Sequence, residues 1–154
     1  MNILTVYYSR TGNTRIIAEA IKNKLNGELE EIRETPSRGG ISGYLKAGKD
    51  ALANADVEIE TPSLSPADFD LVIIGGPVWA FTIAPPVRIY LQQHAEQLNK
   101  VAFFCTERMR GHKGAFEAME KSCGMAPVSC LAVKQGDLKK ETPDKLIDTF
   151  IKEI

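Results

Sequence analysis

Short apolar runs alternate with helix-forming segments along this chain, and this alternation restricts its fold more than any other feature of the sequence. Two of the runs, Leu71–Ile74 and Val101–Cys105, are almost continuously apolar. Runs of this kind are typical of parallel strands that are buried on both faces of a sheet. Ile3–Tyr8 and Val128–Val133 are further candidate strands, and Glu28–Arg33, which is rich in charge, is expected at a sheet edge if it is a strand.

The segments between these runs have the spacing of amphipathic helices. Their apolar stripes are Ile17, Ile21 and Leu25; Ile41, Leu45 and Leu52; Val87, Leu91, His94 and Leu98; Phe116, Met119 and Cys123; and Leu146, Ile147, Phe150, Ile151 and Ile154. Pro86 and Pro143 suit the first turn of a helix, and Thr142 can cap the last one. Strands and helices that alternate in this way predict an α/β fold: a doubly wound sandwich in one domain over residues 1–154.

Composition narrows the class of protein further. The chain has 154 residues, of which 44% are hydrophobic and 25% charged, and its net charge is -1. This near neutrality provides no basic field for nucleic acid or an anionic membrane, so we expect neither as a partner. The three cysteines lack a C-x-x-C spacing, which favours reduced thiols in the cytoplasm. We also expect no signal peptide, because no basic segment followed by an apolar stretch opens the sequence.

The turn after the first predicted strand has the character of a phosphate site. It reads Ser9, Arg10, Thr11, Gly12, Asn13 and Thr14, with three hydroxyls, one amide and one glycine. The next helix is expected to begin at about Asn13, so its unpaired N–H groups and positive dipole end would point into this turn. Serine, threonine and asparagine are also common in ordinary turns and caps, which is the structural alternative.

The turn after the strand at 71–74 is rich in glycine, proline and aromatic residues. It contains Gly75, Gly76, Pro77, Val78, Trp79, Ala80 and Phe81. Trp79 and Phe81 are difficult to bury in an exposed loop, and a planar ligand would account for them. Packing of Trp79 onto its own domain or onto a second subunit is the alternative.

Other binding motifs find no support. No G-x-G-x-x-G follows a predicted strand, and Gly43–Asp50 ends in an aspartate where a nucleotide-triphosphate loop needs a hydroxyl. Cys105 and Arg110 are one residue too close for a cysteine phosphatase loop. Cysteine and histidine spacing predicts no metal site. We expect Cys105, Cys123 and Cys130 in the core, His94 partly buried with its hydrogen bonds satisfied, and His112 on the surface.

The two turns together resemble the flavodoxin-like family, in Tyr8–Thr14 and in Gly75–Trp79. The resemblance implies a five-stranded sheet in the order 2-1-3-4-5, with FMN at its carboxyl edge. The FMN phosphate would be bound by Ser9, Thr11, Gly12, Asn13 and Thr14, and Arg10 could add its charge there or point to water. The flavin ring would lie against Pro77, Val78, Trp79, Ala80 and Phe81, and the turn after the fourth strand would add Thr106, Glu107, Arg108 and Gly111. Many members have a glycine that adopts positive φ where this chain has Ala80, and alanine tolerates that conformation less readily.

The resemblance favours an FMN-binding electron carrier without catalytic acid–base residues. Alternatives are a small NAD(P)H- or quinone-linked FMN oxidoreductase and a non-redox binding module that retains only the fold. The expected partner is a redox protein or a small-molecule electron acceptor, and the chain is expected to be a monomer or a homodimer.

Overall fold

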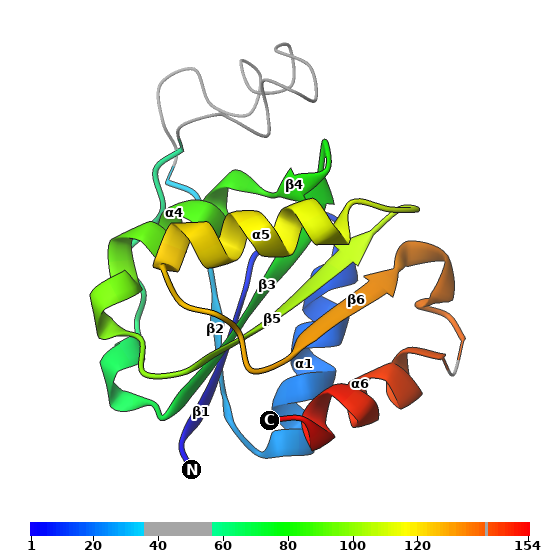
Figure 1. The fold of residues 1–154 in the computed structure, drawn as a ribbon, viewed down its shortest axis with the longest axis horizontal. Coiled ribbons are helices and arrows are strands. Elements are labelled where there is room, and N and C mark those ends of the chain that lie inside the picture. The colour runs from blue at the N-terminus through cyan, green and yellow to red at the C-terminus, as the bar shows by residue number, and fades with distance from the viewer. Residues whose placement is uncertain (36–56, 141) are drawn as a thin grey trace.

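The computed structural model of the protein describes residues 1–35, 57–140 and 142–154, and its centre is a parallel sheet (Figure 1). The sheet strands, in spatial order, are β2 (Glu28–Glu31), β1 (Ile3–Tyr7), β3 (Leu71–Trp79), β5 (Val101–Glu107) and β6 (Cys130–Lys134). Neighbouring pairs along this path are all parallel. The predicted order of five parallel strands is therefore confirmed, and the charged β2 lies at the edge as expected.

Helices cover the sheet on both faces. They are α1 (Asn13–Leu25), α4 (Pro85–His94), α5 (His112–Cys123) and α6 (Thr142–Lys152). Helices α1 and α6 contact each other on one face, and α4 and α5 contact each other on the other face (Figure 1). Three short 3-10 turns, Pro66–Asp68, Ala95–Gln97 and Gln135–Asp137, complete the connections among these elements. The helix predicted around Ile41–Leu52 lies outside the described residues.

The two faces of the sheet form two separate apolar cores. Leu4, Val72, Ile74 and Phe103 contribute to the core under α4 and α5. Ile3, Ile73 and Phe104 point to the opposite face and pack with α1 and α6. Consecutive residues of one strand thus enter opposite cores, which explains why the central strands are apolar without interruption. Among the described helices, none is both long and apolar enough to span a lipid bilayer.

The sequence did not predict the short strand β4 (Thr82–Ile83). Strand β3 continues beyond Ile74 as far as Trp79, and β4 then pairs antiparallel with its end, Val78 opposite Ile83 and Trp79 opposite Thr82. The apolar run had indicated only the first four residues of β3, because Gly75, Gly76 and Pro77 interrupt the strand-forming pattern although they are buried, and Val78 and Trp79 are only half-buried.

Two predictions about single side chains are wrong. Cys105 and Cys123 are buried as expected, but Cys130 is exposed, because only Leu131 and Val133 of edge strand β6 are buried. Partial burial of the thiol, with the carboxylates of Glu120 and Glu153 nearby, still raises the pKa of Cys130 to about 11. His94 is half-buried as expected, yet neither of its ring nitrogens has a hydrogen-bond partner within the described residues. Its ring packs instead on that of Tyr90, with the centroids 4.6 Å apart.

Candidate functional site

The polar turn between β1 and α1 is organised by Gly12. This residue has a φ of +95°, a left-handed conformation that favours glycine, and it is the N-cap of α1. Its N–H donates to Ser9 Oγ over 3.1 Å, and its carbonyl accepts from the N–H of Ile16 over 3.2 Å. Glycine has no side chain to cap the helix, so the first N–H groups of α1 remain directed into the turn. This geometry suits an anion at the helix N-terminus.

Thr14 lies beneath this turn rather than on its surface. Its hydroxyl is 2.8 Å from the hydroxyl of Thr106, at the end of β5, and both residues are buried. The bond ties the start of α1 to the end of β5, a strand that β3 separates from β1. Thr14 therefore supports the turn from below, and Thr11, which is exposed, is the threonine on its open side.

We expect this buried pair to show strong energetic coupling. Thr14→Val or Thr106→Val alone leaves one buried hydroxyl without a partner and should lower the free energy of unfolding by about 1–3 kcal/mol. The double variant removes both hydroxyls, so its loss should be smaller than the sum of the two single losses. Urea unfolding of the four proteins measures the coupling, and simple additivity would contradict the assignment.

The end of β3 forms a tight hairpin that carries the aromatic residues. Its two central residues, Ala80 and Phe81, both have positive φ values, +49° and +65°. Positive φ at both positions is what a two-residue type I′ turn requires, and glycine or asparagine usually supplies it. Ala80 thus adopts the conformation that alanine tolerates less readily, at a cost of about 1 kcal/mol or more.

Two glycines at the start of α5 allow this hairpin to approach the helix closely. A Cβ atom on Gly111, which has a φ of +118°, would lie 2.7 Å from Val78 Cγ1. A Cβ on Gly114 would lie 2.1 Å from the carbonyl oxygen of Phe81. Only residues without side chains fit at these two positions. The first turn of α5 is therefore in direct contact with the backbone of the hairpin.

Trp79 connects the hairpin to the polar turn. The guanidinium carbon of Arg10 lies 5.6 Å from the centre of the indole ring, within the range of a cation–π contact. Tyr8 meets the same ring edge-on, with the centroids 5.9 Å apart. Phe81 is 60% exposed, and Arg110 lies 5.6 Å from its ring centre. The structure thus brings the two predicted turns together and half-buries Trp79 against its own domain.

The turn after β5 is anchored by a buried carboxylate. Glu107 is 2% exposed, and its Oε2 accepts the backbone N–H of His112, the first residue of α5, over 2.9 Å. The ring nitrogen Nδ1 of His112 lies 3.0 Å from Oε1 of the same carboxylate. An acidic group at this end of a helix is favourable because it opposes the helix dipole. Glu107 is therefore directed towards the start of α5, a role that the sequence did not indicate.

The predicted site residues fall into three groups by exposure. Thr14, Pro77, Thr106 and Glu107 are buried; Ser9, Gly12, Asn13, Val78, Trp79, Ala80 and Gly111 are half-buried; Arg10, Thr11, Phe81 and Arg108 are exposed. They all lie at the carboxyl edge of β1, β3 and β5, which are neighbours in the sheet. Gly114 was missed as part of this site, since nothing in the local sequence pattern shows that it approaches the backbone of Phe81. His112, which was expected on the surface, is half-buried and contacts Glu107.

Comparison with known proteins identifies the architecture. No family model matches the chain. It is 24% identical over 148 residues to an uncharacterized protein of Archaeoglobus fulgidus, covering 95% of this chain and 94% of that protein. Among solved structures, the flavoprotein of Lactobacillus acidophilus in complex with FMN is 21% identical, with a TM-score of 0.68 over 97% of this chain and 98% of that one. The chain has the flavodoxin-like fold.

Oxidised flavodoxin 2 of Bacillus cereus is a further structural neighbour, with 20% identity and a TM-score of 0.61 over 99% of this chain and 97% of that one. In doubly wound folds of the flavodoxin-like type, ligands bind outside the carboxyl ends of the strands, where the strand order reverses. Here the order reverses between β1 and β3. The polar turn and the aromatic hairpin follow these two strands, so the candidate site occupies the position that this fold offers to a ligand.

Proposed function

We propose that this protein binds FMN at the carboxyl edge of its sheet and uses it to transfer electrons. The single observation that carries the proposal is that the polar turn around Gly12 lies next to Trp79. Arg10 of this turn lies 5.6 Å from the centre of the indole ring. One part offers N–H groups and a helix N-terminus to a phosphate, and the other offers a ring to a planar group. FMN carries a phosphate and a planar ring at opposite ends of one small molecule.

The residues present fit this cofactor. Around Gly12, a Cβ atom would meet no other atom within 4 Å, so the turn is open on that side. We assign phosphate binding to Ser9, Arg10, Thr11, Gly12 and Asn13. We assign the ring to Trp79 and Ala80, with Val78, Phe81, Arg108 and Gly111 at its borders. Thr14, Pro77, Thr106 and Glu107 are buried and would hold these contact residues in place.

When bound, FMN supplies the redox chemistry, because it accepts and returns electrons at its ring system. The protein positions the ring and controls its access to solvent. Exposed Phe81 and Met109 beside the candidate site provide an apolar border for an electron donor or acceptor, which we propose is a redox protein or a small molecule. The Lactobacillus acidophilus neighbour was crystallised with FMN, which supports the cofactor assignment.

Titration with two flavins tests the binding site. The purified protein should bind FMN with a change in the visible spectrum, and Thr11→Val should weaken FMN by about tenfold through loss of one hydrogen bond to a charged group. Riboflavin lacks the phosphate, so its affinity should not change in the variant. Thr149→Val, on the distant helix α6, is the matched control, because the Thr149 hydroxyl donates to the Lys145 carbonyl within its own helix.

Three results would contradict parts of the proposal. If neither flavin binds the unmodified protein, the FMN assignment is wrong and a non-redox module remains. If Thr11→Val weakens both flavins equally, the phosphate lies elsewhere. If the loaded protein steadily oxidises NAD(P)H in the presence of a quinone, it is an oxidoreductase rather than a carrier, since a carrier shows no such turnover.

A further inference from the structure

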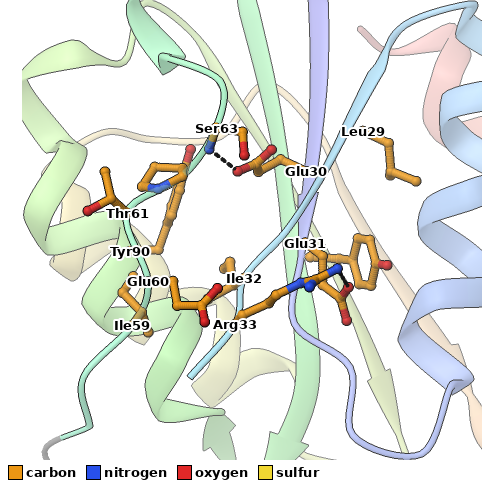
Figure 2. A pocket seen from close by; sticks show the side chains of 12 residues that line it. Leu29, Glu30, Glu31, Ile32, Arg33, Ile59, Glu60, Thr61, Ser63 and Tyr90 are labelled. Atoms are coloured by element: carbon orange, nitrogen blue, oxygen red, sulfur yellow. Dashed lines mark hydrogen bonds and ion pairs between the residues drawn. The ribbon is translucent and has the colours of Figure 1, made fainter. Parts of the chain in front are cut away.

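A cavity lies at the edge of the sheet beside β2, away from the candidate flavin site. It has a volume of about 400 Å³ and is enclosed by β2, by the residues that follow β2 and by residues 59–63 (Figure 2). This is within the range of pockets that hold small molecules. Residues 58–60 run antiparallel to residues 33–35, which follow β2, with an isolated bridge between Glu34 and Ile59. The walls of the cavity are thus fixed by backbone pairing.

Tyr90 of α4 contributes an unusual group to this cavity. The side chain is 1% exposed, and its hydroxyl is buried without a hydrogen-bond partner among the residues that the structure describes. A buried hydroxyl that lacks a partner is destabilising, so its presence calls for an explanation. Figure 2 shows the ring extending from α4 with its hydroxyl end towards Ser63 and Glu30. Burial, with Glu30 nearby, raises the pKa of Tyr90 far above its ordinary value, so the phenol keeps its proton and can both donate and accept.

The charges around the cavity select the kind of ligand. Glu31 is paired with Arg33, whose Nη2 lies 3.3 Å from its carboxylate, so these two charges largely cancel. Glu30 accepts the N–H of Ser63 over 2.5 Å, a single bond to a carboxylate that has room for several. Glu60 adds a third carboxylate, which has no ion pair with any other described residue. The lining is therefore net negative, which opposes an anion and attracts a cation.

We propose that this cavity binds a short aliphatic diamine. One ammonium group would donate to the Glu30 carboxylate and to the Tyr90 hydroxyl, and the other would pair with Glu60. Figure 2 places Glu30 and Glu60 in different parts of the cavity, one beside Ser63 and the other beside Arg33. Two separated negative groups match a molecule with two separated positive ones. The methylene chain would lie along Ile32 and Ile59, which also line the cavity.

Calorimetric titration with 1,4-diaminobutane tests this proposal, and 1,4-butanediol serves as the uncharged probe of the same length. Only the diamine should bind, and binding should weaken as salt is added. Tyr90→Phe retains the ring and removes only the unpartnered hydroxyl, so the fold should keep or gain thermal stability while the diamine binds several-fold more weakly. Glu30→Gln should weaken the diamine by about tenfold or more, since it removes a charge-assisted hydrogen bond.

Glu60→Gln provides a second variant that leaves the Glu30–Ser63 bond intact, and it should also lose about tenfold in affinity. Glu96→Gln, an exposed glutamate outside the cavity, is the matched control and should bind the diamine as the unmodified protein does. Absence of diamine binding, or equal binding by Glu60→Gln and Glu96→Gln, would overturn the proposal. The diamine titration is made with and without FMN. Absence of diamine binding therefore does not bear on the flavin site, and absence of flavin binding does not bear on the diamine test.

Discussion

Gly75→Ala should lower the free energy of unfolding by about 3 kcal/mol, the upper end of the usual cost of overpacking a core. Gly75 pairs with Phe104 where β3 and β5 run side by side at the centre of the sheet. A Cβ atom on Gly75 would lie 2.4 Å from the Phe104 carbonyl oxygen and 2.5 Å from its ring. Both strands are buried there, so neither the backbone nor the ring has room to move away.

Urea unfolding measures this loss, and Gly136→Ala is the matched control. A Cβ atom on Gly136 would meet nothing within 4 Å, and its φ is not in the left-handed range, so this variant should change stability by less than about 1 kcal/mol. A Gly75→Ala protein as stable as Gly136→Ala would show that β3 and β5 are not packed as closely as described.

Gly114→Ala should weaken both FMN and riboflavin, by about tenfold or more, while Thr11→Val affects FMN alone. Alanine in place of glycine within a helix normally stabilises it by about 0.5–1 kcal/mol. Here the added methyl group would lie 2.1 Å from the carbonyl oxygen of Phe81, so the hairpin must shift away from α5. A displacement of this size moves Trp79, the residue proposed to face the flavin ring, and small misplacements at a site have large effects.

The contrast between these two variants separates the two halves of the proposed site. Parallel flavin titrations with FMN and riboflavin measure it, again with Gly136→Ala as the control. Should Gly114→Ala bind riboflavin as tightly as the unmodified protein, the ring does not depend on the position of the hairpin, and the assignment of Trp79 would have to be abandoned.

Local sequence pattern was sufficient for the framework of the molecule. The apolar run at Leu71–Ile74 lies on a strand buried on both faces, and charged Glu28–Glu31 forms the edge strand. The helix start expected at about Asn13 is confirmed, because glycine next to polar residues marks a helix boundary. Pro85 and Pro86 likewise open α4. In each case the signal is carried by residues close together in the chain.

Long-range contacts decided the details of the candidate site. In the sequence, Thr14 looks like one more hydroxyl of the polar turn. Only its 2.8 Å contact with Thr106, 92 positions away, shows that it lies beneath this turn. The carboxylate of Glu107 is directed to the start of α5 because His112 lies there to bind it. The exposure of Cys130, and the lack of a partner for the His94 nitrogens among the described residues, also depend on which neighbours the fold supplies.

The sequence by itself determined that the chain alternates strands and helices, that its sheet is parallel, and that a polar turn and an aromatic turn leave the same edge. Periodicity and turn chemistry are local properties, and they are sufficient for these conclusions. Only the tertiary structure decided that Ala80 and Phe81 adopt positive φ and that Gly114 lies against Phe81. It also decided that the buried Tyr90 hydroxyl has no partner in the part of the chain that the structure describes. Each of these depends on the packing of residues far apart in the chain, which outweighs local preference.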